Sequence, residues 1–240
     1  MGPLVIAVPG RLDPASVAVM SAQLTNIDDV PAVILEGTSE FFCLGMTFDK
    51  ASASGVAGSV ELRRDLESFA ALLSRILNSP RPTLAVVDGP AFGGGLGLAA
   101  ACDCVLASPR ANFSLPEALY GLEPAIIRTA LLTRLTVQKL NFLLFSCHSR
   151  SAAEAYAIGL VDRIVEVEQL ERAKSEIVRQ FGRAQSETVI NMRRRNSTAF
   201  VQALEAGVGA TAAALASDQV SAALDAAADE RLPWMDGPRR

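Results

Sequence analysis

Histidine and paired cysteines are scarce in this chain, and both shortages exclude kinds of chemistry. The 240 residues contain one histidine, His148, so a mechanism or a metal site that needs two histidines from one subunit is excluded. No two cysteines form a CxxC pair, and we interpret all four as reduced thiols at apolar positions, because free cysteine behaves as a small buried hydrophobe. They are Cys43, Cys102, Cys104 and Cys147. We expect no metal centre.

A large excess of charge of one sign and a long apolar run are also missing. The chain has 22 basic and 26 acidic side chains, for a net charge of −4, which does not favour a polyanion-binding surface. Its apolar stretches are interrupted well before the roughly 18 residues that a membrane span needs. The N-terminal stretch has no basic segment followed by an apolar one, so it does not resemble a secretory signal. We expect a cytoplasmic protein with neither nucleic acid nor membrane as partner.

The chain is 50% hydrophobic, and segments with a strand pattern alternate along it with segments that have a helix pattern. Strands are expected at 4–8, 32–35, 83–88, 104–107 and 160–165. Helices are expected at 13–24, 61–77, 125–135, 137–145, 151–158 and 168–183, with residues 51–59 as a mobile loop. This alternation predicts an α/β fold with parallel strands. Residues 1–185 would form the core, and 186–240 a helical region that packs on the core or on a neighbouring subunit.

A glycine-rich turn at residues 87–102, VDGPAFGGGLGLAAAC, joins a strand to a small-residue helix. It can be a tight turn, since glycine tolerates backbone angles that other residues avoid. A dinucleotide site is a second interpretation, but no acidic residue ends a following strand where that site needs one. A third is an oxyanion hole, because amide groups at a helix N-terminus point at one spot and carry the positive end of the helix dipole.

Four segments together resemble the crotonase (enoyl-CoA hydratase/isomerase) superfamily. They are FCLGMTF at 42–48, VDGPAFGGG at 87–95, FSLPEALYGL at 113–122, and Ala155 with GLVD at 159–162. The resemblance implies a ββα spiral core with a C-terminal helical trimerisation region, assembled as a homotrimer or as paired trimers in a hexamer. It also implies a substrate carried as an acyl thioester on the phosphopantetheine of an acyl carrier protein or coenzyme A, with no other cofactor.

Site residues are carried over by position in these segments. The backbone N–H groups of Met46 and Gly94 would polarise the thioester oxygen and stabilise an enolate. The neighbouring glycines would line the substrate, and they are Gly45, Gly93 and Gly95. Glu117 would be the catalytic acid and base.

Hydratases of the family have a second carboxylate after the glycine turn, where this chain has Gly97. Its absence argues against efficient addition of water to an ordinary enoyl-CoA. It fits isomerases, and dehydratases that act on acidic or branched substrates.

A finer resemblance, which includes Gln138-Lys139 and the terminal LPWMD, is to the dehydratase of polyketide β-branching cassettes. That enzyme removes water from 3-hydroxy-3-methylglutaryl on an acyl carrier protein to give 3-methylglutaconyl. Arg128 would bind the distal carboxylate of this substrate, with Lys139 as a weaker candidate, since a guanidinium suits a bidentate grip. Alternatives are the decarboxylase that acts next, an enoyl-CoA isomerase, and a non-catalytic crotonase-like binding subunit.

Several other polar residues have a structural interpretation. We expect His148 and Glu123 at the surface and Tyr120 in packing. The arginines at 193–195 and 63–64 are candidates for docking an acidic carrier protein.

Overall fold

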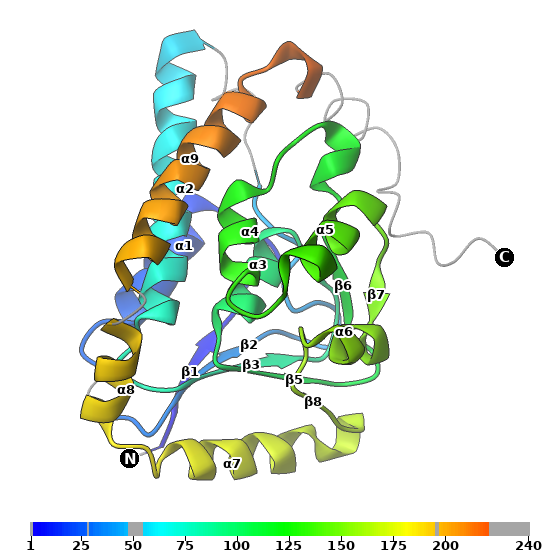
Figure 1. The fold of residues 1–240 in the computed structure, drawn as a ribbon. Coiled ribbons are helices and arrows are strands. Elements are labelled where there is room, and N and C mark those ends of the chain that lie inside the picture. The colour runs from blue at the N-terminus through cyan, green and yellow to red at the C-terminus, as the bar shows by residue number, and fades with distance from the viewer. Residues whose placement is uncertain (1, 28, 48–54, 195–196, 221–240) are drawn as a thin grey trace, which may run out of the picture.

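The computed structural model describes residues 2–27, 29–47, 55–194 and 197–220, and its main sheet has helices on both faces. Figure 1 shows α7 (Leu170–Phe181) beneath a five-stranded sheet, with the other long helices above it. The strands are β1 (Leu4–Ala7), β2 (Val33–Glu36), β3 (Thr83–Val87), β5 (Cys104–Ala107) and β8 (Arg163–Ile164). They pair in the order β1-β2-β3-β5-β8, all in parallel, as the alternating sequence predicts.

Alternate residues of these strands pack in two separate apolar layers. One set faces α7 and contains Ile34, Leu84, Val86 and Leu106, which pack with Leu170, Ala173 and Ile177. The residues between them join the main core under the upper helices. Strands buried on both faces read as continuous apolar runs, which is why the sequence pattern locates them well.

A second, three-stranded sheet lies beside the first and was not expected from the sequence. Its strands are β4 (Ala91–Phe92), β6 (Asn112–Ser114) and β7 (Arg150–Ser151), in the order β4-β6-β7. Strands of two or three residues are too short to carry a periodic pattern. Their contribution is positional, because β4 leads into the glycine turn and β6 leads toward Glu117.

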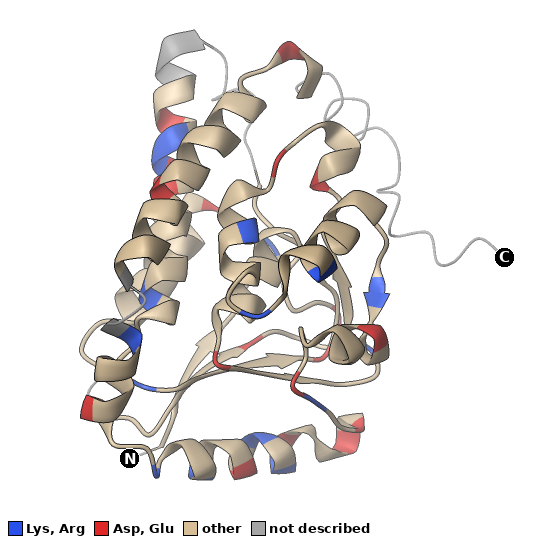
Figure 2. Ribbon diagram, in the orientation of Figure 1, with Lys and Arg blue, Asp and Glu red and all other residues tan. Residues whose placement is uncertain are grey.

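The helices follow the predicted segments closely. They are α1 (Pro14–Gln23), α2 (Gly55–Leu77), α3 (Gly94–Ala101), α4 (Ala125–Leu131), α5 (Val137–Ser146), α6 (Ala152–Ile158), α7, α8 (Ser186–Arg194) and α9 (Ser197–Leu215), with 3-10 turns η1 (Glu117–Tyr120) and η2 (Val167–Gln169). Asp13 caps α1 by accepting a 2.7 Å hydrogen bond from the amide of Ser16, and Pro14 follows it. Figure 2 shows charges of both signs along α7 and none on α3.

The loop expected at 51–59 is wrong for residues 55–59, which open α2, while 48–54 lie outside the described residues. Small residues favour a loop locally, but further along α2 the buried side chains of Leu66, Phe69, Leu73 and Ile76 hold the helix to the core. Extending an anchored helix costs much less than nucleating one. The helix therefore continues backward through the small residues.

The C-terminal helices return to the upper layer, where α9 lies beside α2 and α4 (Figure 1). A Cβ at Gly207 would lie 3.1 Å from backbone atoms of Ala125 and Ile126, so glycine permits the close approach of α9 to α4. The segment Thr198–Leu215 is long and apolar enough to cross a membrane by length and composition. In this fold it buries Leu204 and Val208 in the core. The boundary at residue 185 stays a prediction.

Candidate active site

The segment around Gly45 is held between two neighbouring stretches of backbone. On one side, Phe92 donates a 2.8 Å hydrogen bond to the carbonyl oxygen of Cys43. On the other, the amide of Leu12 donates to the carbonyl oxygen of Gly45 at 2.9 Å, and Thr47 donates to that of Leu12 at 2.8 Å. These bonds place the peptide between Gly45 and Met46 beside the end of β4.

The N–H of Met46 points away from Leu12, because in a parallel bridge only its neighbours bond to the partner strand. In an extended strand, the backbone N–H and C=O groups of successive residues point to opposite sides. The backbone of Cys43 forms hydrogen bonds on the side of β4 and that of Leu44 forms one with Gly10, so the backbone groups of residue 45 would be expected to point toward β4 again. Gly45 instead has φ +96° and reverses the alternation, a conformation that glycine adopts without steric cost. The Met46 amide is thereby turned toward α3, and within the described residues it donates to no acceptor.

The N-terminal turn of α3 supplies the second amide. Gly93, with φ +51°, donates to the carbonyl oxygen of Ser114 at 3.0 Å and brings the chain into the helix. Gly94 is the first helical residue, and within the described residues its N–H has no acceptor. A Cβ at Gly45 would lie 3.3 Å from the Gly94 nitrogen. The expected pair of amides, from Met46 and Gly94, is therefore brought together at the positive end of a helix.

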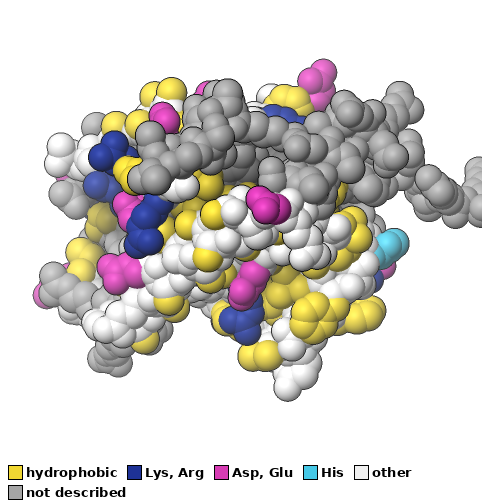
Figure 3. Space-filling model, turned by 90° about the horizontal axis from the view of Figure 1, so that it is seen from above, with side chains coloured by type: hydrophobic (Ala, Val, Ile, Leu, Met, Phe, Trp, Pro, Cys, Tyr) yellow, Lys and Arg dark blue, Asp and Glu magenta, His cyan; other side chains and the backbone are white. Residues whose placement is uncertain are grey.

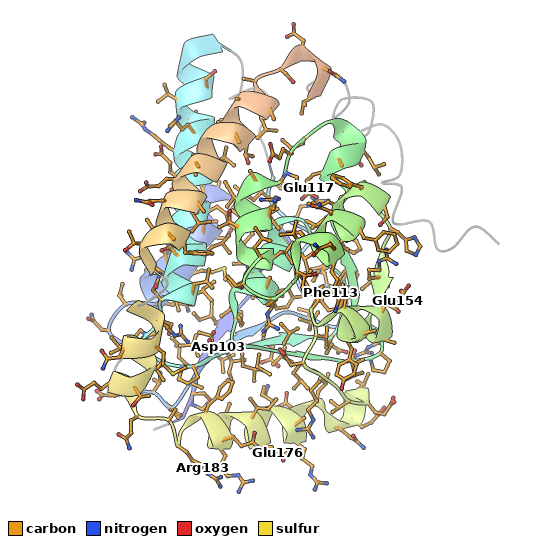
Figure 4. All side chains as sticks on the ribbon, viewed as in Figure 1. Asp103, Phe113, Glu117, Glu154, Glu176 and Arg183 are labelled. Atoms are coloured by element: carbon orange, nitrogen blue, oxygen red, sulfur yellow. The ribbon has the colours of Figure 1, made fainter. Side chains whose placement is uncertain are left out.

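Glu117 lies against this turn. Its Oε1 is 2.8 Å from the place that a Cβ would take on Gly93, so a side chain at position 93 would displace the carboxylate from this place. Its Oε2 is buried and has no hydrogen-bond partner among the described residues. Figure 4 shows Glu117 above the main sheet, apart from the labelled Asp103, Glu154 and Glu176. Of the predicted side chains, Glu117 is the one that the structure places at the two amides.

Burial controls the charge of this carboxyl group. Desolvation raises the pKa of Glu117 to about 7, because the apolar surroundings disfavour the carboxylate. A group with this pKa is present in both protonation states near neutral pH. It can therefore accept a proton from one atom and return it to another.

Tyr120 and Cys147 lie near enough to Glu117 to feel its charge. Burial raises the pKa of each, and the negative charge of Glu117 adds to the rise. Tyr120 follows Glu117 by three residues in η1, and side chains at this spacing eclipse one another in a 3-10 helix. The sequence interpretation of Tyr120 as packing missed this proximity, which the three-residue spacing could have indicated.

The position that lacks an acid has an apolar neighbour. A Cβ at Gly97 would lie 3.5 Å from both Cγ atoms of Ile127 and 3.7 Å from Cζ of Phe69. Hydrocarbon rather than a second carboxylate therefore adjoins Gly97. No group of three or more His, Cys, Asp or Glu side chains within the described ranges could hold a metal ion.

The other expected substrate residues lie in different settings. A Cβ at Gly95 would lie 2.2 Å from the Cys43 carbonyl oxygen, so this glycine is required for packing of α3 against the Gly45 segment. The Lys139 ammonium donates to the carbonyl oxygen of Ile158 at 3.1 Å, at the C-terminal end of α6. Arg128 is half-buried on α4, directly after Ile127. Binding of a distal carboxylate by Arg128 or Lys139 stays a prediction.

Two of the arginines expected to dock a carrier protein, Arg63 and Arg193, form contacts within the chain, and Arg195 lies outside the described residues. Arg193 is mostly buried and donates to Asp103 at 2.5 Å and to the carbonyl oxygens of Ile76 and Leu77. These contacts hold the Arg193 guanidinium at the end of α2, and docking of a carrier protein at the arginines stays a prediction. Arg63 pairs with Glu67 at 2.9 Å, and seen from above, charges of both signs are interleaved (Figure 3). His148 and Glu123 are exposed, as expected.

The fold and this site together define the crotonase class of α/β proteins, and comparison with known proteins agrees. The family model described as enoyl-CoA hydratase/isomerase matches residues 14–229. The chain belongs to the enoyl-CoA hydratase/isomerase family.

Individual relatives share about a third of their residues or fewer with this chain in the matched stretches. A Thermus thermophilus protein provisionally named enoyl-CoA hydratase is 33% identical over 174 residues, which cover 70% of this chain and 69% of that one. The bacillaene synthase dehydratase PksH of Bacillus subtilis is 33% identical over 133 residues, 55% of this chain and 51% of PksH. The solved structure of an enoyl-CoA hydratase from Bacillus halodurans superposes with a TM-score of 0.86 at 21% identity, covering 93% of this chain and 96% of that one. The stretch of matching sequence thus spans about half the length of PksH.

Proposed function

We propose that the protein dehydrates 3-hydroxy-3-methylglutaryl thioester on an acyl carrier protein to 3-methylglutaconyl thioester, in polyketide β-branching. The observation that carries the proposal is the buried carboxyl group of Glu117 beside the N–H groups of Met46 and Gly94, which donate to no acceptor within the described residues. An apolar surface at Gly97 replaces a second acid. The likeness to a dehydratase of bacillaene synthase supports the choice of substrate.

In this mechanism Glu117 performs both proton transfers. As a carboxylate it removes a proton from the carbon next to the thioester carbonyl, and the negative charge moves to the thioester oxygen. The N–H groups of Met46 and Gly94 stabilise that oxyanion, an effect worth about 3–4 kcal/mol per donor. Protonated Glu117 then gives the proton to the 3-hydroxyl group, which leaves as water while the carbon–carbon double bond forms.

The experiment is to incubate the protein with 3-hydroxy-3-methylglutaryl carrier protein and weigh the acyl arm by mass spectrometry. Loss of one water supports the dehydratase. With 3-methylglutaconyl carrier protein as a second substrate, loss of carbon dioxide would instead assign the decarboxylase, and a shift of its carbon–carbon double bond at unchanged mass would assign an isomerase. Each of those reactions can also proceed with one carboxylate.

The Glu117→Gln variant separates an enzyme from a non-catalytic binding subunit. It should slow turnover by about 10²–10⁴-fold, while Glu123→Gln, an exposed acid six residues later, serves as the control and should leave the rate unchanged. Turnover that is equal in both variants would remove Glu117 from the mechanism.

The partners and assembly belong to the same proposal. We expect an acyl carrier protein to deliver the substrate on its phosphopantetheine arm, and Arg128 to bind the distal carboxylate. We also expect a homotrimer or a hexamer. Only 22% of the apolar segment Thr198–Leu215 is buried within one chain, which supports a role for α9 in subunit contact. Light scattering of the purified protein measures the oligomer.

A further inference from the structure

Ile127 is a side chain beside the site that the proposed mechanism does not use. It lies on α4 and is 9% exposed. Both of its Cγ atoms lie 3.5 Å from the place that a Cβ would take on Gly97, with Phe69 near the same point. Ile127 therefore covers the first turn of α3 with hydrocarbon.

The same helical turn connects Ile127 to the catalytic carboxyl group. The amide of Gly97 donates to the carbonyl oxygen of Gly93 at 3.1 Å, which closes the first turn of α3. Glu117 lies over Gly93 at the start of this turn, and Ile127 lies over Gly97 at its end. Residues four apart on a helix are neighbours separated by about 5–6 Å. An acyl chain whose thioester oxygen accepts a hydrogen bond from the Gly94 amide would thus have Glu117 as a polar neighbour and Ile127 as an apolar one.

We propose that Ile127 determines specificity by selecting acyl thioesters that carry an alkyl branch at C3, an inference that rests on the proposed function. The hydroxyl and methyl substituents of C3 would then face different neighbours, with the hydroxyl group directed to Glu117 and the methyl group to Ile127. Transfer of a methyl group from water to a hydrocarbon surface is favourable in free energy. A hydroxyl group turned toward Ile127 would lose its hydrogen bonds, so the apolar wall also disfavours the reversed orientation.

Binding of two unreactive thioesters tests this role without turnover. The probes are 3-methylglutaryl-pantetheine and glutaryl-pantetheine, which differ by one methyl group and lack the 3-hydroxyl that dehydration needs. Titration calorimetry on the full chain should show about fourfold tighter binding of the branched probe, the contribution expected for one buried methyl group. Ile127→Ala should bring the affinity ratio close to one, and the milder Ile127→Val should give an intermediate ratio.

Ile126→Ala is the matched control, because Ile126 is the preceding residue of α4 and is 2% exposed. It should retain the wild-type ratio. An unchanged ratio in Ile127→Ala, an equal loss in Ile126→Ala, or no binding of either probe to the wild type would each overturn the inference. These results are distinct from failure of the proposed function, since a binding preference that depends on Ile127 could persist in a protein that releases no water.

Discussion

The protonation of Glu117 is the property of a single residue that most directly controls the proposed reaction. Because burial raises its pKa to about 7, the Glu117 carboxyl group of the free protein is mainly protonated at pH 6 and mainly ionised at pH 8. Proton removal needs the ionised form, so kcat/KM for water loss should rise with pH and level off above about 7.

A pH series of initial rates with carrier-bound substrate checks this prediction. The Glu123→Gln variant should give the same profile as the wild type, since Glu123 is exposed. A rate that already levels off near pH 5 would mean that another group limits the reaction.

The raised pKa also predicts how stability depends on pH. An unfolded glutamate titrates near 4.5 and the folded one near 7, so between these values the folded state binds more protons. The contribution of Glu117 to stability is then greatest below pH 4.5, falls as pH rises toward 7, and changes no further above it. Glu117→Gln removes the titrating group, so the variant should gain stability relative to the wild type across this window, by up to about 3 kcal/mol. Urea unfolding at pH 5 and pH 8 measures the change, and equal differences at both values would contradict it.

At the scale of an element, α3 contains glycines with different roles. A Cβ at Gly95 would lie 2.2 Å from the Cys43 carbonyl oxygen, whereas one at Gly97 would meet atoms only at 3.5 Å and beyond. Gly95→Ala should therefore push α3 away from the Gly45 segment and destabilise the protein by more than about 2 kcal/mol. Gly97→Ala should be tolerated or stabilising by up to about 1 kcal/mol, since alanine favours helix. Thermal unfolding of the pair makes the comparison, and similar melting temperatures would count against this packing.

Elements with a strong pattern were predictable from the sequence, and those defined by tertiary contacts were not. The apolar strand at 83–87 and the amphipathic helix ending at 77 are both observed where the pattern places them. The three-stranded sheet lacks such a pattern, and its short strands are defined by pairing between segments far apart in the chain, such as Ala91 with Phe113.

Some residues of the site were likewise predictable from the sequence and others were not. Glu117, Met46 and Gly94 follow from motif positions, and the structure brings them together. Ile127 was not singled out, because its place beside Gly97 depends on how α4 crosses α3, which no local spacing reveals.

At the scale of the whole molecule, Arg193 ties the C-terminal helices to the core. From α8 it donates to the carbonyl oxygens of Ile76 and Leu77 at the end of α2, and to Asp103 beside the main sheet. Asp103 also accepts hydrogen bonds from the amide and hydroxyl group of Thr83. One guanidinium thus connects a C-terminal helix, a long helix and the sheet, so its loss should affect more than its own surroundings.

Arg193→Met keeps much of the side-chain volume and removes every donor. It should lower the free energy of unfolding by about 2–3 kcal/mol, because the carbonyl oxygens at the end of α2 lose a charged donor. Arg172→Met, at an exposed position on α7, is the matched control and should change stability by less than about 0.5 kcal/mol. Since α9 follows α8 and covers α2 and α4, hydrogen exchange should also quicken in α9 of the Arg193 variant. Loss of stability without faster exchange in α9 would show that Arg193 supports only the end of α2.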